Sequence, residues 1–351
     1  MASAIKIGKN TLGNDHPCFV IAEAGVNHNG SLDMALELVR AVKRTGADCI
    51  KFQTFKASAV VTKEAPKADY QLQVTDRAES QLDMLRKLEL DRSAYDAIIE
   101  CCKEEGVLFL STPYNYDDAD FLNELGVEAF KIASGQLVEH AFLEHVASFG
   151  KPLIISTGMA TMEEVTEAVD VILATGNEQL VVLQCTTNYP SLLEDANVRA
   201  MVTMGEELNV LVGYSDHVES DHACLASVAL GACVVEKHFT LDRSLPGPDH
   251  SSSLEPDGFT ELVEGIRGIS RSLGDGFKKP TPAEVANTRG MRRSIVALED
   301  IPTGTVLTKD MLGFKRPADG LAPKRLKELI GKRAARDLMA DEQLSEDSVE
   351  W

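Results

Sequence analysis

Eight short apolar runs rich in β-branched residues alternate with amphipathic stretches along this 351-residue chain. The runs cover residues 19–25, 49–55, 107–113, 129–135, 153–158, 180–187, 211–217 and 233–239. Strands that alternate with helices predict parallel βαβ units, and eight strands close a (β/α)8 TIM barrel. An open doubly wound sheet is the rival fold, but no G-x-G-x-x-G sequence follows any run. We therefore predict an α/β fold built on a TIM barrel.

The runs begin with apolar residues and end with polar residues or glycine, as in Phe130-Lys-Ile-Ala-Ser-Gly135. In a barrel, the carboxyl ends of all strands meet at one rim, where the loops build the active site. His217 and His238 lie at the ends of two consecutive runs, and their separation of 21 positions is about what a loop, a helix and the next strand consume. We expect both imidazoles at the same rim.

The composition changes after an amphipathic stretch that ends near residue 273. Residues 274–282 are rich in glycine and proline, which indicates a linker. We predict a barrel domain over residues 1–273, a linker over 274–291 and a small β-rich domain over 292–351. A module of about 60 residues has only a small core, so we expect it to dock onto another surface.

Charge and composition exclude several partners. The net charge of −20 argues against nucleic acid and against an anionic membrane surface. No run of 18 apolar residues is present, and the N-terminus lacks the apolar core of a signal peptide, so we expect a cytoplasmic protein. Seven cysteines without C-x-x-C spacing predict reduced, packed thiols. A small anionic substrate stays compatible, because a few local lysines set its affinity.

Lysines and histidines in the predicted strands indicate the chemistry. Lys51 and Lys131 lie inside barrel strands, where a lysine is costly without an anion to meet. Two imidazoles with open coordination positions can hold a divalent ion that polarises a carbonyl group. We therefore take His217 and His238 as candidate metal ligands.

The strand period separates two neighbours of His238. Residues 236 and 238 share one face of a strand, so Glu236 faces the same rim as the histidine. Lys237 points to the opposite face, and we expect it to be structural.

Seven motifs occur in order and carry a family resemblance. They are Ile21-Ala-Glu-Ala-Gly-Val-Asn-His-Asn-Gly30, Lys51-Phe-Gln-Thr54, Lys131-Ile-Ala-Ser-Gly135, Ser156-Thr-Gly-Met159, Gly213-Tyr-Ser-Asp-His217, Glu236-Lys-His-Phe-Thr240 and Gly247-Pro-Asp249. Over about residues 15 to 345 the chain resembles the sialic acid (N-acetylneuraminate) synthases. Its tail, with Arg292-Arg-Ser and Lys315-Arg-Pro, resembles their C-terminal antifreeze-like (SAF) domain, a small β-clip module.

The resemblance implies a reaction. Phosphoenolpyruvate (PEP) condenses with the open-chain aldehyde of an N-acyl amino sugar, giving a nine-carbon 2-keto acid and phosphate by cleavage of a C–O bond. The implied cofactor is a divalent metal, with Mn²⁺ as first choice and Mg²⁺ or Co²⁺ as alternatives. The implied assembly is a domain-swapped homodimer.

The resemblance also implies roles for matched residues. Glu23 and Glu236 join His217 and His238 as catalytic residues, and Glu23 stabilises positive charge at C2 of PEP and takes a proton. The alternative for Glu23 is an anion at the N-terminal end of the following loop or helix. Residues implied to bind PEP are Lys51, Thr112, Lys131, Ser134, Ser156, Thr187 and Ser215, and those implied to bind the sugar are Gln53, Tyr189, Asp249 and Arg316.

Thr187 departs from the family pattern. In Cys185-Thr-Thr-Asn-Tyr-Pro190 it occupies the position where the neuraminate synthases carry asparagine, and Asn188 follows one step later. A strand residue shifted by one points to the other face, so Asn188 does not replace the missing amide. Either the PEP site uses a hydroxyl group here, or the sugar specificity differs.

Several functions stay open at this point. N-acetylmannosamine is the first choice of sugar, followed by the 2,4-diacetamido-2,4,6-trideoxy sugar of a legionaminic acid synthase and then by the substrate of a pseudaminic acid synthase. A Schiff-base aldolase would use Lys131 and would need neither a metal nor paired histidines. An antifreeze-like tail also suggests a non-catalytic ice-binding or carbohydrate-binding protein, against which the polar residues at the rim argue.

Overall fold

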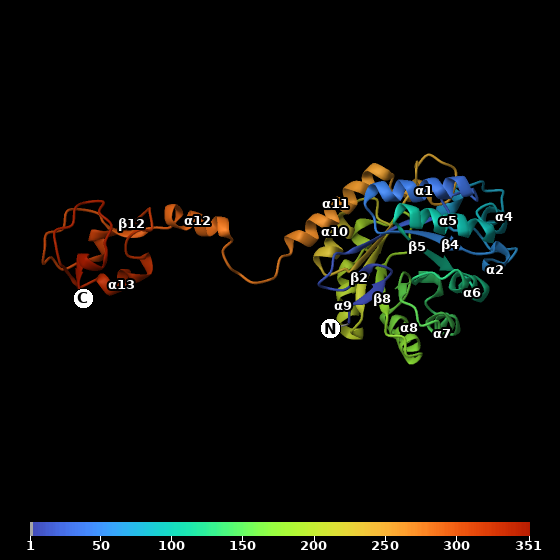
Figure 1. Ribbon diagram of the computed structural model, residues 1–351, viewed down its shortest axis with the longest axis horizontal. Coiled ribbons are helices and arrows are strands. Elements are labelled where there is room, and N and C mark those ends of the chain that lie inside the picture. The colour runs from blue at the N-terminus through green and yellow to red at the C-terminus, as the bar shows by residue number, and fades with distance from the viewer. Residues whose placement is uncertain (1–2) are drawn as a thin grey trace. The chain divides into compact units, whose positions relative to one another are not determined.

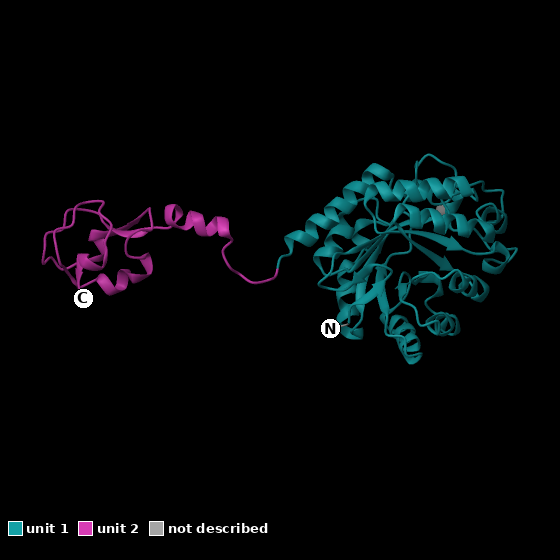
Figure 2. Cartoon of the chain, viewed as in Figure 1, with its two compact units in different colours: residues 1–274 teal, residues 275–351 magenta. Residues whose placement is uncertain are grey.

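A computed structural model describes residues 3–351 of the chain. The described residues fall into two compact units, one ending at Gly274 and the other covering 275–351 (Figure 2). All seven cysteines are free and buried, as packed thiols would be. No helix in the described part of the chain is long and apolar enough to cross a lipid bilayer.

The first unit is built on eight parallel strands in one sheet. They are β3 (Phe19–Gly25), β4 (Cys49–Thr54), β5 (Leu108–Pro113), β6 (Phe130–Ile132), β7 (Leu153–Ser156), β8 (Leu180–Cys185), β9 (Leu211–Asp216) and β10 (Val234–His238). The strand order is β5-β4-β3-β10-β9-β8-β7-β6, and the two outermost strands contact each other, so the sheet is a nearly closed barrel. Each predicted run contains one of these strands, and the predicted TIM barrel is confirmed.

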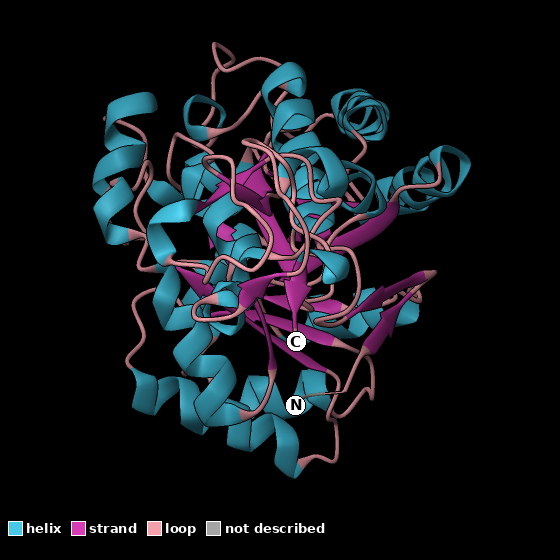
Figure 3. Ribbon diagram, turned by 90° about the vertical axis from the view of Figure 1, so that its left-hand side faces the viewer, coloured by secondary structure: helices cyan, strands magenta, loops and turns pink. Residues whose placement is uncertain are grey.

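Helices surround the strands (Figures 1 and 3). They are α1 (Leu32–Thr45), α5 (Arg92–Glu105), α6 (Tyr116–Glu124), α7 (His140–Ala147), α8 (Met162–Ala174), α9 (Val198–Leu208), α10 (His222–Ala229) and α11 (Pro256–Ser272). Two of these helices begin with a side-chain cap: Ser31 accepts from the Met34 amide, and Thr161 forms a capping box with Glu164. The apolar faces of the helices and the outer faces of the strands form the main core.

A short hairpin closes the N-terminal end of the barrel. Strands β1 (Ile5–Ile7) and β2 (Asn10–Leu12) pair antiparallel. Ile7 and Leu12 pack in one buried cluster with Phe19 and Leu211, the first residues of two barrel strands. With this end filled by apolar side chains, the carboxyl ends of the strands are left to form a site.

A long insertion separates β4 from α5. Residues 55–91 contain the short helices α2 (Ala57–Val60), α3 (Asp69–Val74) and α4 (Gln81–Arg86). Phe55 and Leu88 of this insertion form a buried cluster with Val26, and Val60 and Leu85 pack against them. We call these five residues the apolar wall. Short 3₁₀ helices follow other strands, including η1 (Ser134–Gln136), η2 (Leu193–Asp195) and η3 (His250–Ser252).

The second unit is small and β-rich, as predicted. It contains α12 (Pro282–Met291), β11 (Ser294–Ala297), η4 (Lys309–Met311), β12 (Leu312–Lys315), η5 (Pro323–Arg325), α13 (Leu326–Leu329), β13 (Arg333–Ala334), η6 (Glu346–Ser348) and β14 (Val349–Glu350). Its own core includes Ile295, Leu307, Leu329 and Leu344. Helix α12 lies within residues 274–291, where the composition indicates a linker.

Candidate active site

A cavity of about 720 Å³ lies among the carboxyl ends of the barrel strands and the loops that follow them. Fourteen of the fifteen residues singled out from the sequence line it: Glu23, Lys51, Gln53, Thr112, Lys131, Ser134, Ser156, Thr187, Tyr189, Ser215, His217, Glu236, His238 and Asp249. The fifteenth, Arg316, directly follows β12 in the second unit and is exposed. The strand-end residues therefore converge on one site.

Strand alternation decides which side chains reach the cavity. Glu236 and His238 line it, whereas Lys237 between them is not among its lining residues. Lys237 instead lies 2.5 Å from Asp216 in a buried ion pair. Asp216 is likewise the residue between Ser215 and His217, both of which line the cavity. The outward orientation expected for Lys237 is thus observed.

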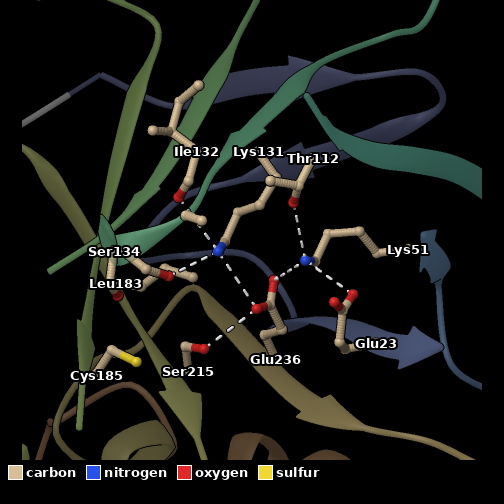
Figure 4. A network of polar contacts seen from close by, with 12 residues as sticks. Glu23, Lys51, Thr112, Lys131, Ile132, Ser134, Leu183, Cys185, Ser215 and Glu236 are labelled. Atoms are coloured by element: carbon tan, nitrogen blue, oxygen red, sulfur yellow. Dashed lines mark hydrogen bonds and ion pairs between the residues drawn. The ribbon is translucent and has the colours of Figure 1, made fainter. Parts of the chain in front are cut away.

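Two buried lysines and two buried carboxylates form the floor of the cavity (Figure 4). Lys51 Nζ lies 2.8 Å from Glu23 Oε2 and 3.7 Å from Glu236 Oε2. Lys131 Nζ lies 3.4 Å from Glu236 Oε1. Glu236 therefore bridges both cations, and Glu23 contacts only one of them.

Hydroxyl groups complete the surroundings of the lysines. Lys51 donates to Thr112 Oγ1 over 3.2 Å, and Lys131 donates to Ser156 Oγ over 2.7 Å. Ser215 Oγ donates to Glu236 over 3.2 Å, and Ser134 Oγ accepts from the Gly158 amide over 2.9 Å. Buried cations and hydroxyls within one cavity provide the donors that phosphate and carboxylate groups require.

The two carboxylates have opposite tendencies to hold a proton. Burial raises the pKa of Glu23, and the charge of Glu236 raises it further, against the opposing effect of Lys51. Burial also acts to raise the pKa of Glu236, but Lys131 and Lys51 outweigh it and hold this pKa at about 2. Glu236 therefore stays ionised, while Glu23 is suited to exchange a proton.

The two histidines have ring centroids 5.4 Å apart. His217 Nδ1 lies 2.7 Å from the Thr186 carbonyl oxygen, which only accepts, so Nδ1 carries a hydrogen and, in the neutral ring, Nε2 has a free lone pair. His238 Nδ1 is buried and has no hydrogen-bond partner among the described residues. Burial and the nearby His217 lower the pKa of His238 well below its usual value, so its ring is neutral.

This pair fits a divalent metal ion. Metal–nitrogen bonds of about 2 Å let two rings at this separation reach one ion, and an unpartnered buried nitrogen is suited to be a ligand. No group of three or more His, Cys, Asp or Glu residues in the described chain is arranged to hold a metal. A bound ion would thus keep several positions for water or substrate.

The candidate sugar-binding residues lie beside these groups. The ring of Tyr189 is 4.0 Å from that of His217. Gln53 donates to Glu23 Oε1 over 3.2 Å and accepts from the Tyr114 hydroxyl over 3.2 Å. Burial, followed by the charge of Glu23, raises the pKa of Asp249 to about 7.

Thr187 faces the cavity, and Asn188 does not. The Thr187 hydroxyl is buried without a hydrogen-bond partner in the described chain, whereas Asn188 is exposed and is not a lining residue. Asn188 therefore does not supply an amide at this position, as the strand period predicts.

Sequence reasoning missed several lining residues. Tyr114, two positions after Thr112, follows the strand-end pattern and was detectable from it. Gln136 lies in η1, and its Nε2 is buried without a partner among the described residues. Cys185 Sγ lies 3.8 Å from His217 Nδ1. The apolar wall gave no sequence signal, because its residues look like any other core.

Residues 38–278 match the model of the NeuB family, and residues 292–350 match the SAF domain. The chain belongs to the NeuB family. As a member of this family, it is an enzyme, a PEP-utilising transferase.

Individual NeuB-family proteins match nearly the whole chain. The chain is 44% identical to the N,N'-diacetyllegionaminic acid synthase of Campylobacter jejuni, over 93% of this chain and 98% of that protein. It is 42% identical to the N,N'-diacetyllegionaminic acid synthase of Legionella pneumophila, over the full length of both. The crystal structure of the sialic acid synthetase of Leptospira borgpetersenii in complex with citrate is 31% identical, with a TM-score of 0.72 over 82% of this chain and 95% of that one.

Membership of the NeuB family removes two alternatives. A Schiff-base aldolase and a non-catalytic ice-binding or carbohydrate-binding protein are not retained, because the matched relatives are synthases over their full length. The predicted resemblance to sialic acid synthases with a SAF domain is confirmed at the level of the family.

Proposed function

We propose that this enzyme condenses PEP with the open-chain form of an N-acyl amino sugar to give a nine-carbon 2-keto acid and phosphate. The observation that carries this proposal is the floor of the cavity. Lys51 and Lys131 are buried there, each donates a hydrogen bond to a hydroxyl group, and two imidazoles line the same cavity. PEP carries a phosphate and a carboxylate, and both need cations and hydroxyl donors within one site.

The residues have the following roles. Lys51 and Lys131 bind the two anionic ends of PEP and hold C3 against the sugar aldehyde. Bond formation between C3 and the aldehyde carbon leaves positive charge on C2, which the Glu23 and Glu236 carboxylates stabilise. A water molecule adds to C2, the C2–O bond breaks, and phosphate leaves with the bridging oxygen.

Glu23 is the proton acceptor for the water that adds to C2. Burial raises its pKa, which makes its carboxylate a better base than one of ordinary pKa. The Lys51 contact of 2.8 Å fixes the direction of the carboxylate. Glu236 cannot share this role because its pKa is held at about 2, and it holds the two lysines in place instead.

His217 and His238 would hold Mn²⁺, with Mg²⁺ or Co²⁺ as alternatives. When bound, the ion polarises the aldehyde carbonyl of the sugar. The donor set supports this assignment, since two imidazoles leave most of the coordination sphere to oxygen ligands.

The sugar is a 2,4-diacetamido-2,4,6-trideoxy hexose, as in a legionaminic acid synthase. Relatives of that name are 44% and 42% identical to the chain. The apolar wall, Val26, Phe55, Val60, Leu85 and Leu88, lines the cavity and suits the methyl groups of two acetamido substituents and of C6. N-acetylmannosamine, our first choice from the sequence alone, has fewer methyl groups to bury.

The lining also argues against a phosphorylated acceptor. Among the described lining residues, Lys51 and Lys131 are the only lysine or arginine side chains, and both lie on the floor with the carboxylates. A second phosphate group would therefore meet no further cation from the barrel.

The test is a product analysis by mass spectrometry. Purified enzyme, PEP and Mn²⁺ are incubated with a panel that holds the diacetamido trideoxy sugar, N-acetylmannosamine and its 6-phosphate. We expect one phosphate released per nine-carbon acid, with kcat/KM for the diacetamido sugar at least tenfold above that for N-acetylmannosamine. A Lys131→Met control should release no phosphate. Release with N-acetylmannosamine as the preferred sugar would reject the specificity, and release with no sugar would reject the condensation.

A further inference from the structure

A buried polar network lies on the face of β9 and β10 that points away from the cavity. Asp216 and Lys237 are paired in the register of the two strands and are 1% and 3% exposed. Lys237 Nζ lies 2.5 Å from Asp216 Oδ2. Ser215 and His217 flank Asp216 in the sequence, and Glu236 and His238 flank Lys237.

Every polar atom of the pair is used. Lys237 also donates to the Val218 and Ser220 carbonyl oxygens over 2.6 and 3.3 Å. Asp216 accepts from the Tyr214 hydroxyl over 3.1 Å and from the Val218 amide over 3.0 Å. The Cys224 thiol, on α10, donates to Asp216 over 3.1 Å. A fully satisfied network of this kind fixes the groups that take part in it.

The network holds the loop that carries His217. Both carbonyl groups bound by Lys237 belong to residues 218–220, directly after the histidine. The Ser191 amide donates to the His217 carbonyl over 2.8 Å, and Ser191 forms a parallel bridge with Val218. The connection therefore runs from β10 through Lys237 to the loop after β9, and on to the loop after β8 that carries Tyr189.

Stability alone does not require a buried ion pair at this place. Replacing a buried ion pair by packed apolar residues is often neutral or stabilising, because two charges lose their hydration on burial. Asp216 and Lys237 are each flanked in the sequence by two residues that line the cavity, and this position gives the pair another role. We infer that Asp216 and Lys237 are positioning residues that set the separation of His217 and His238, and hence the affinity of the site for a divalent ion.

This inference rests on the proposed function, and one experiment separates the two. The double variant Asp216→Leu with Lys237→Met removes both charges and leaves neither one buried alone. We expect it to fold, with near-native circular dichroism, but to bind Mn²⁺ at least tenfold more weakly by electron paramagnetic resonance. We expect kcat to fall at least tenfold and KM for PEP to change less than threefold, because Lys51 and Lys131 lie on other strands. Amide exchange of residues 218–220 should become faster.

The matched control removes an ion pair at the other end of the barrel. Arg267 lies 2.6 Å from Asp48, which precedes β4. Asp48→Asn with Arg267→Met should leave the Mn²⁺ affinity unchanged, whatever its effect on thermal stability. If the wild type binds no Mn²⁺, the proposed metal site fails and the inference with it.

If the wild type binds Mn²⁺ and the folded double variant binds it within threefold, only the inference is overturned. Should the double variant not fold, Tyr214→Phe with Cys224→Ala removes two donors to Asp216 and keeps both charges. We expect at least threefold weaker Mn²⁺ binding for that variant, and unchanged binding would also overturn the inference.

Discussion

Lys51 and Lys131 are 3% exposed, and each meets a carboxylate or hydroxyl group inside the barrel. A buried lysine without such partners would be strongly destabilising. Glu236 contacts both lysines and keeps its charge, whereas Glu23 meets one lysine and gains basicity from burial. Residues of one chemical type thus acquire different roles from their surroundings.

The two histidines give the first prediction. We expect His217→Ala and His238→Ala to lower kcat more than tenfold at saturating Mn²⁺, because loss of a ligand removes carbonyl polarisation; a tenfold loss corresponds to about 1.4 kcal/mol. Circular dichroism should stay unchanged. His16→Ala, at an exposed position before β3, is the control and should keep full activity. If His217→Ala or His238→Ala keeps more than a tenth of the wild-type kcat, these two histidines are not the metal ligands.

The raised pKa of Asp249 predicts the direction in which the stability of the protein changes with pH. Its ordinary pKa is 3.8 and its pKa in the folded protein is about 7, so the folded state holds the proton more tightly than the unfolded state. The contribution of Asp249 to stability is therefore lost as the pH rises from about 4 to 7, and Asp249→Asn lacks this pH-dependent contribution. The difference in free energy of unfolding, variant minus wild type, should increase by on the order of 2–3 kcal/mol when the pH is raised from 5 to 8.

Urea denaturation of metal-free enzyme at pH 5 and pH 8 measures this difference. Asp15→Asn, at an exposed position, is the control, and its difference from the wild type should not change with pH. A difference that stays constant with pH, or that falls, would contradict the raised pKa of Asp249.

The fate of the bridging oxygen gives the third prediction. If water adds to C2 of PEP with Glu23 as base, oxygen from ¹⁸O-labelled solvent appears in the keto acid and not in phosphate. Mass spectrometry of both products measures it. Label in the phosphate would mean that the P–O bond breaks, and the role given to Glu23 would be wrong.

At the scale of elements, the barrel strands place the site by their register and close approach. Strand β9 passes β10 where Gly213 pairs with Val234. A Cβ atom on Gly213 would lie 2.4 Å from the Val234 carbonyl oxygen and 2.7 Å from Leu183 Cδ2. Only glycine fits here, and Ser215 and His217 follow on the same chain segment.

Gly213→Ala should therefore destabilise the barrel. We expect a loss of about 1–3 kcal/mol in the free energy of unfolding, as for other overpacked cores, since a backbone oxygen cannot move aside as a side chain does. Gly268→Ala in α11 is the control, because a Cβ atom there meets nothing within 4 Å. That change should be neutral or stabilise by up to about 1 kcal/mol. Equal urea midpoints for the two variants would contradict this account.

At the scale of the whole molecule, the second unit carries the one candidate residue outside the barrel. Arg316 is exposed and makes no ion pair with any described residue. We propose that it completes the active site of a partner subunit in a domain-swapped homodimer, where its guanidinium binds sugar hydroxyls or an acyl oxygen and helps to exclude water.

Mixing two inactive variants tests this arrangement. His217→Ala and Arg316→Ala chains are refolded together, each nearly inactive alone. In a symmetric swapped dimer with statistical pairing, half of the dimers are mixed and each has one intact site, so about a quarter of the wild-type activity should return. If Arg316 serves its own barrel, confirmed mixed dimers will show no recovery.

The sequence by itself determined the barrel and most of the rim. Eight apolar runs with polar ends predicted strands whose carboxyl ends meet, because parallel strands joined by helices all point the same way. The strand period was sufficient to send Glu236 and His238 inward and Lys237 outward. These properties depend on local patterns, which a sequence displays directly.

Tertiary structure alone decided the remainder. The ion pair of Lys237 with Asp216 joins residues 21 positions apart, and the apolar wall joins Val26 to residues 55–88. The pKa values of Glu23 and Glu236 depend on which lysines lie within a few ångströms. Contacts between distant segments set burial and charge neighbours, and no local pattern encodes them.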